Sequence, residues 1–299
     1  MFDFRLHVFH VVARRRSFTR AAEELFITQP AVTKHIRELE SHFKLSLFER
    51  SGNRKIRLTP AGEVLLRYTE RLSSVYKELE FEMNTLTSQH KGVLKIGAST
   101  TIAQYIIPPI LAQFHSRFKD IKVRLMTANT EQIENALLHK DIDLGMIEGY
   151  TRNPNLNYQG FIQDEIVLVA GSANPAFKKD AIRPEDLKKY PLLVREPGSG
   201  TLEVLAHALK EHNIRLADLQ IEMELGSPES IKSYLLNSNC LAFLSVAAIF
   251  KELKAGDCRI IDIKGLSIKR PFSFIQLHGQ PLSLSALFIR FAEQHKKHS

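Results

Sequence analysis

The chain has 299 residues, of which 44% are hydrophobic and 25% charged, and it carries a formal net charge of +8. This composition predicts a globular protein of two or three domains, and its two cysteines, Cys240 and Cys258, are too few for a disulfide framework. No stretch reaches the roughly 18 consecutive apolar residues of a membrane span, and the first residues lack a secretory signal pattern. We therefore expect a cytoplasmic protein with ordinary thiols and no membrane contact.

The positive charge is concentrated near the N-terminus. Residues 1–58 hold 12 Lys/Arg and 6 Asp/Glu, whereas the rest of the chain holds 29 and 27. A local basic excess favours a polyanionic partner such as nucleic acid. A basic surface that contacts only solvent would give the same count. The charge alone therefore does not distinguish a nucleic-acid-binding surface from a solvated one, and a sequence motif is needed.

Two short helices are predicted within this segment, over residues 18–26 and from Thr28 to about Phe43. Thr28 has the character of an N-cap, and Pro30 occupies the first turn, where a missing N–H costs nothing. Two helices joined by a tight turn, the second with an exposed polar and basic face, form a helix-turn-helix.

One long helix is predicted from Pro60 to about Gln89, a stretch without a second proline and with no glycine after Gly62. A leucine repeat of seven residues is typical of a coiled-coil seam between two chains. The alternative is a helix packed on its own domain, which usually needs a wider apolar stripe. We therefore predict a dimer through this helix, with four leucines in the seam: Leu65, Leu72, Leu79 and Leu86.

After Gly92 the pattern changes to apolar strands that alternate with helices. Such alternation implies a parallel sheet covered on both faces. The chain is long enough for two lobes, about 91–163 with 268–299 and about 164–267, joined by crossover strands. The predicted fold class is α/β.

The segment SFTRAAEELFITQPAVTKHIRELE, followed by LSLFERSGNRKIRLTPAG, resembles the LysR-type transcriptional regulators. The resemblance implies a winged helix-turn-helix over residues 1–59, a linker helix over 60–90 and a two-lobed, periplasmic-binding-protein-like effector domain over 91–299. Arg16 and Lys44 depart from the family pattern, since glycine is usual at both positions. Short motifs, GASTTIAQYIIPPIL, MIEG and REPGSGT, are similar to the branch with regulators of sulfur assimilation and carbon fixation.

The resemblance implies that the helix from Thr28 to about Phe43 enters the major groove of double-stranded DNA. Gln29 can pair with adenine, Lys34 and Arg37 can reach guanine or phosphate, and Thr33 can contact a base or a thymine methyl. A solvated helix face is the alternative. The Ser51-Gly52-Asn53 turn predicts a wing, whose three basic residues are expected to contact the phosphate backbone: Arg50, Arg54 and Lys55.

A second site is predicted where strands end and helices begin. Hydroxyl groups and unpaired backbone N–H groups at a helix start suit an anion, and the cleft between two lobes is where ligands bind in such folds. The segments begin at Ser99, Asn129 and Pro197. N-capping alone would explain any one of them, but the three together match the effector site of the family. The expected ligand is a sulfate- or sulfite-like anion first and a sugar phosphate second. The candidate residues are Ser99, Thr100, Thr101, Thr130, Gly198, Ser199, Gly200 and Thr201.

Glu148, at the end of the strand in MIEG, is also a candidate for the effector site. Its carboxylate would repel an anion unless it is protonated or paired. It could instead accept a hydrogen bond from an amine-bearing ligand, or pair with an arginine, for which Arg195 is the candidate.

The favoured function is a DNA-binding regulator that responds to a small molecule. The alternative is a solute-binding protein with the same two lobes. An enzyme is the third hypothesis, but the sequence has no nucleophile elbow, dinucleotide fingerprint or metal-ligand spacing. No cofactor is expected, and the expected partners are DNA, a small anion, further copies of the chain as a homodimer or homotetramer, and RNA polymerase as an additional candidate.

Overall fold

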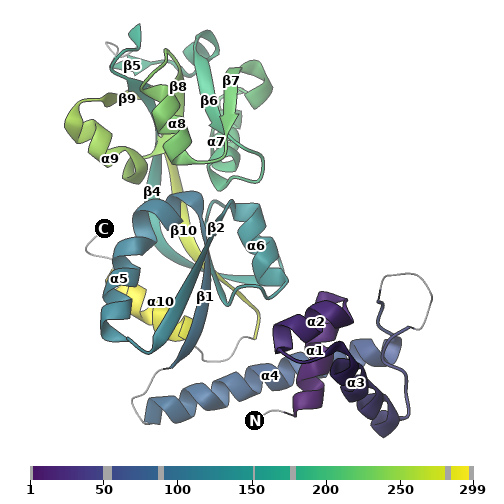
Figure 1. Cartoon of the computed structure of the whole chain (residues 1–299). Coiled ribbons are helices and arrows are strands. Elements are labelled where there is room, and N and C mark those ends of the chain that lie inside the picture. The colour runs from purple at the N-terminus through teal and green to yellow at the C-terminus, as the bar shows by residue number, and fades with distance from the viewer. Residues whose placement is uncertain are drawn as a thin grey trace. The chain divides into compact units, whose positions relative to one another are not determined.

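The structure is a computed structural model in which two compact units are seen (Figure 1). One unit lies within residues 3–86 and the other within residues 91–295. Among the residues described, no helix combines the length and the apolar character that crossing a bilayer requires. The described residues are 3–49, 56–86, 91–150, 152–175, 180–279 and 284–295.

The first unit contains the predicted helix-turn-helix. Each of its first three helices begins with an N-cap residue whose side chain accepts a hydrogen bond from a backbone N–H of the first turn. These N-cap residues are Asp3, Ser17 and Thr28. These helices pack around a core that includes Phe9 and Ile36, and an isolated bridge between Phe48 and Leu58 closes the unit. The predicted wing turn lies outside the described residues. The helices are α1 (Phe4–Arg15), α2 (Phe18–Leu25), α3 (Gln29–Phe43) and α4 (Pro60–Leu86).

The three helices of the DNA-binding motif end on residues in the left-handed region of backbone conformation. Arg16 has φ 48°, Phe26 has φ 54° and Lys44 has φ 53°. This conformation costs non-glycine residues of the order of 1 kcal/mol, which is why glycine is the usual choice at a helix end. The two departures from the family pattern, Arg16 and Lys44, are therefore positions where a side chain is held in a glycine conformation.

The apolar residues of α4 divide into two sets. Leu65 packs into the core of the first unit, so it is not available to the predicted seam. Leu72 and Leu79 belong to a stripe of exposed apolar side chains, and the side chain of Leu86 lies outside the described part. The stripe repeats every three or four residues: Val64, Tyr68, Leu72, Val75, Leu79 and Met83.

The first lobe of the second unit has a sheet with helices on both faces, as Figure 1 shows. Its elements are β1 (Gly92–Ser99), the π-helical turn η1 (Ile102–Ile106), α5 (Ile107–Arg117), β2 (Ile121–Ala128), α6 (Thr130–Leu138), β3 (Leu144–Glu148) and α10 (Leu284–Gln294). β1 pairs in parallel with β2 and β3. Phe114 of α5 and Phe288 of α10 pack in one core cluster, and Ile133 of α6 packs in another.

The second lobe repeats this arrangement around β6, which pairs in parallel with β7 and β8. Its elements are β5 (Ala181–Ile182), η3 (Pro184–Lys189), β6 (Pro191–Arg195), α7 (Gly200–Lys210), η4 (Leu216–Asp218), β7 (Gln220–Leu225), α8 (Pro228–Leu235), β8 (Leu241–Ser245), α9 (Val246–Ala255) and β9 (Cys258–Ile263). Cys240 and Cys258 are free thiols and both are buried. The parallel pairing in both lobes confirms the predicted α/β class.

Two long strands connect the lobes. β4 (Leu156–Gly171) and β10 (Ile268–Leu277) run antiparallel to each other, with a register shift at Phe272/Ser273. The central part of β10, from Phe272 to Ile275, also pairs with β3, and the last part of β4 pairs with β8 and β9. One sheet path therefore crosses both lobes, in the order β2-β1-β3-β10-β4-β8-β6-β7.

Candidate functional site

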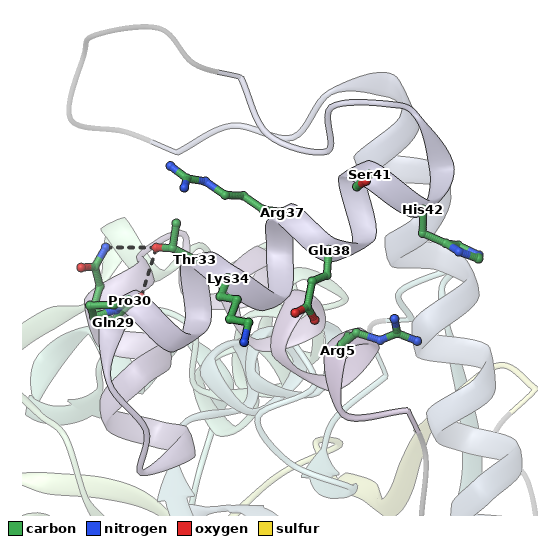
Figure 2. Close-up of a pocket in the computed structure, with 9 residues that line it drawn as sticks. All are labelled: Arg5, Gln29, Pro30, Thr33, Lys34, Arg37, Glu38, Ser41 and His42. Atoms are coloured by element: carbon green, nitrogen blue, oxygen red, sulfur yellow. Dashed lines mark hydrogen bonds between the residues drawn. The ribbon is translucent and has the colours of Figure 1, made fainter.

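A shallow groove runs along the exposed face of α3. Figure 2 shows the nine residues that line it. Arg5 comes from α1 and the other eight come from α3. Four of the seven predicted DNA-binding residues are among them, and the other three, Arg50, Arg54 and Lys55, lie outside the described residues. The groove is lined by Arg5, Gln29, Pro30, Thr33, Lys34, Arg37, Glu38, Ser41 and His42.

Two of these side chains are bound to each other at the start of α3. The Thr33 hydroxyl donates to the Gln29 backbone oxygen at 3.1 Å, and the Gln29 amide donates to the Thr33 hydroxyl at 3.4 Å (Figure 2). A long side chain that is held in one orientation loses less conformational freedom when it binds. Thr33 therefore orients Gln29 in addition to offering its own methyl and hydroxyl groups.

The groove also contains four residues that the sequence pattern did not indicate: Arg5, Glu38, Ser41 and His42. Arg5 is fixed by Asp3, with 2.7 Å between Nη2 and Oδ2 and 3.1 Å between Nε and Oδ1. Its position beside α3 depends on tertiary packing and carries no local signal. The other three could have been found from the helical period, because they extend the face of Lys34 and Arg37 by one turn.

The second candidate site lies between the two lobes. Every predicted effector residue that has a side chain is buried there, and the remaining two are Gly198 and Gly200. The Thr201 hydroxyl donates to Glu148 Oε1 at 3.0 Å, and the Thr130 hydroxyl donates to the Glu148 backbone oxygen at 3.3 Å. Gly200 approaches the same strand end so closely that a Cβ there would lie 2.3 Å from the Glu148 oxygen. The structure thus brings Thr130, Glu148, Gly200 and Thr201 together.

The lobes also meet at the loop that precedes α7. The Asn129 side-chain amide donates to Pro197 O at 3.3 Å, and the Glu131 N–H donates to Gly198 O at 3.2 Å. Gly198 has φ 83°, and a Cβ on it would lie 2.5 Å from a Glu131 carboxylate oxygen. The positive φ favours glycine at this position, whereas the Glu131 carboxylate is the end of a flexible side chain that can move aside.

Three predicted hydroxyl groups have no hydrogen-bond partner within the described residues, although they are buried. These are Ser99 Oγ, Thr100 Oγ1 and Ser199 Oγ. Ser99 is the last residue of β1 and Thr100 follows it, whereas Ser199 precedes α7 in the other lobe. A buried hydroxyl without a partner costs free energy, which a bound ligand or water would recover.

Glu148 pairs with Arg270 and not with Arg195, the candidate from the sequence. Arg270 Nη1 lies 3.2 Å from Glu148 Oε1, and both side chains are buried. Arg195 binds Glu196 instead, with 2.8 Å between Nε and Oε2. The prediction was wrong because only the crossing of β10 against β3 places Arg270 near Glu148.

Arg270 also binds Asp164 and Thr201, and so it connects β10 to three other elements: β3, β4 and α7. Its Nε donates to Asp164 Oδ2 at 2.8 Å and its Nη1 donates to Thr201 Oγ1 at 2.8 Å. The Ser245 hydroxyl donates to the other Asp164 oxygen at 2.7 Å. Burial raises the pKa of the Asp164 carboxyl, against the opposing effect of Arg270.

No set of three or more His, Cys, Asp or Glu side chains suited to a metal ion occurs in the described ranges. The two sites offer groups for recognition by hydrogen bonds and charge: a basic groove on α3, and buried hydroxyl groups between two lobes.

Known proteins resemble this chain over most of its length. Residues 4–63 match the family model described as bacterial regulatory helix-turn-helix protein, lysR family, and residues 87–297 match the LysR substrate binding domain. The chain is 33% identical over 270 residues to the HTH-type transcriptional regulator CysL of Bacillus subtilis (strain 168), covering 90% of this chain and 89% of CysL. It is 34% identical over 275 residues to a probable RuBisCO transcriptional regulator of Thalassiosira pseudonana, covering 90% and 89%.

Among solved structures, the regulatory domain of Synechocystis PCC6803 CcmR in complex with 2-PG is similar to this chain. The TM-score is 0.63 at 27% identity, and the match covers 70% of this chain and 99% of that domain.

Proposed function

Because the chain belongs to the LysR family of DNA-binding transcriptional regulators, we propose that a small oxyanion bound between its two lobes controls its activity. This family consists of regulators and not enzymes, which removes the enzyme hypothesis and the solute-binding alternative. The probable RuBisCO transcriptional regulators among the relatives agree with the carbon-fixation part of the branch that the motifs resemble. Sulfate or sulfite is the first candidate, and a sugar phosphate is the second.

The observation that carries the proposal is the set of three buried hydroxyl groups, Ser99, Thr100 and Ser199, that find no partner in the described part of the chain. Hydroxyl groups can donate to all sides of a small oxyanion, and each such bond to a charged acceptor is stronger than a neutral one. The ion pair with Arg270 supports an anion further, because it balances the Glu148 charge that would repel one. Thr101, Thr130, Gly198, Gly200 and Thr201 are proposed to shape the same site.

The test is calorimetry on the full chain with sulfate, sulfite, phosphate and 2-PG, the compound in the CcmR complex. Thr100→Val and Ser199→Ala should each weaken the best anion by about 1–2 kcal/mol, since each removes one hydrogen bond to a charged group. Thr127→Val, an exposed hydroxyl on the neighbouring strand β2, is the matched control and should change nothing. Unchanged affinity in both site variants would mean that the anion binds elsewhere. If the best ligand carries no negative charge, the oxyanion proposal is wrong and Glu148 is the residue that indicates the ligand class.

On the DNA side, we propose that Gln29, Thr33, Lys34 and Arg37 contact bases, and that the wing residues Arg50, Arg54 and Lys55 contact phosphates. The exposed stripe on α4 supports assembly into a homodimer or homotetramer. RNA polymerase is proposed as a further partner and the cytoplasm as the location, since that is where a regulator meets its DNA. The proposed domain boundaries are 1–59, 60–90 and 91–299.

A further inference from the structure

A second polar cluster joins the two lobes at the segment that follows the candidate effector residues. The Tyr105 hydroxyl, from the first lobe, donates to Glu229 Oε1 of α8 in the second lobe at 2.5 Å. Lys232 Nζ lies 2.9 Å from the same Glu229 oxygen and 2.8 Å from Glu252 Oε1 of α9. The ammonium also lies 5.3 Å from the centre of the Tyr105 ring.

The burial of Lys232 makes this cluster costly. Lys232 is only 6% exposed, and a buried ammonium is tolerated only when its charge is paired and its donors are bound. A well-packed apolar residue would often stabilise such a position at least as well. Burial and the bond to Glu229 raise the pKa of Tyr105, so its hydroxyl remains a donor.

Tyr105 belongs to a short turn of unusual geometry. Residues Ile102–Ile106 form a π-helix, in which the N–H of Ile107 bonds to the oxygen of Ile102. Two prolines follow, Pro108 and Pro109. They have no N–H groups to donate to the carbonyl oxygens one turn earlier, as residues of an ordinary helix do. Single π-turns of this kind occur frequently at functional sites.

This turn directly continues the helical segment that begins at Thr100, and Thr101 is its N-terminal flanking residue. The position of Tyr105 therefore sets the position of the two hydroxyl groups that precede it. One end of a single turn carries candidate ligand groups, and the other end is bound to the opposite lobe.

We propose that Tyr105 is a positioning residue of the effector site: through Glu229 and Lys232 it holds the π-helical turn, and with it Thr100 and Thr101, at one separation of the lobes. This inference rests on the proposed effector function. Without the Tyr105 hydroxyl, the lobes sample more separations, and only a fraction of the molecules presents the complete site. The apparent affinity falls by that fraction.

The test compares the full chain with Tyr105→Phe, which keeps the ring over Lys232 and removes the hydroxyl. Tyr158→Phe is the matched control, because its hydroxyl also donates to a carboxylate, Glu134 at 2.8 Å, but within one lobe. Sulfate and 2-PG serve as probes in calorimetry. Separately, spin labels on Gln113→Cys and Glu211→Cys, both exposed, report the distance between the lobes.

Tyr105→Phe should bind the better probe roughly tenfold more weakly, as expected for one lost bond to a charged acceptor. Its distance distribution should broaden without probe and narrow again at saturation, whereas Tyr158→Phe should match the parent in both measurements. An unchanged distribution in Tyr105→Phe, or an equal loss in Tyr158→Phe, overturns the inference. If the parent binds neither probe, the oxyanion proposal fails, and the distances measured without probe still decide the role of Tyr105.

Discussion

Glu148 and Arg270 form an ion pair out of contact with water, with 3.2 Å between Oε1 and Nη1. Glu148 ends β3 and Arg270 lies on β10, so the pair ties the central strand of the first lobe to a strand that crosses into the second. Loss of one partner would leave a buried charge without compensation, which typically costs about 3–5 kcal/mol.

Arg270→Met should therefore lower the free energy of unfolding by about that amount, measured by urea unfolding of the full chain followed by circular dichroism. Arg259→Met, which breaks a surface pair with Asp180, is the control and should stay within about 0.5 kcal/mol. A loss below about 1 kcal/mol for Arg270→Met would show that the buried ion pairs of Arg270 contribute little to stability.

Arg37→Ala tests the groove on α3. If Arg37 contacts a base, specific DNA binding should weaken by about 1–3 kcal/mol, with a smaller effect on random DNA. Fluorescence anisotropy with both kinds of DNA at several salt concentrations measures this difference. Arg117→Ala, an exposed arginine of the other unit, should alter neither. Equal losses on both kinds of DNA would identify Arg37 as a phosphate contact.

The exposed stripe on α4 predicts an interface between two chains. Replacing Leu72 and Leu79 together by lysine would place two charges in that interface, so light scattering should show a smaller assembly. Glu63→Lys adds a lysine to the same helix at an exposed position off the stripe and should leave the mass unchanged. The double variant should assemble like the parent only if the stripe is not the seam.

Lys44→Gly should stabilise the end of α3, because Lys44 holds a left-handed conformation that glycine adopts without strain. A gain of about 1 kcal/mol would slow hydrogen exchange of the α3 amides about fivefold. Lys44→Ala keeps the Cβ atom and should give no such gain. Faster exchange in Lys44→Gly would show that the lysine side chain itself anchors the helix end.

Local patterns were sufficient for the helix-turn-helix and for the α/β class, because caps and apolar periods act over a few residues. Thr28 and Pro30 marked the start of α3 correctly, and the alternation after Gly92 predicted both lobes. The partner of Glu148 could not be found in this way, because Arg270 reaches it only through the pairing of β10 with β3. Leu65 fits a seven-residue repeat as well as Leu72 does, and only tertiary packing assigns it to the core of the first unit.

The path of β10 has a consequence for synthesis of the protein on the ribosome. The strands and helices of the second lobe lie between β4 and β10 in the chain, so they emerge before the last strand of the first lobe. That lobe stays incomplete until Phe272, Phe274 and Phe288 arrive and fill its core. Late, long-range pairing slows folding and leaves apolar surface uncovered in the meantime. The nascent first lobe is therefore the part of the chain that a chaperone would bind first.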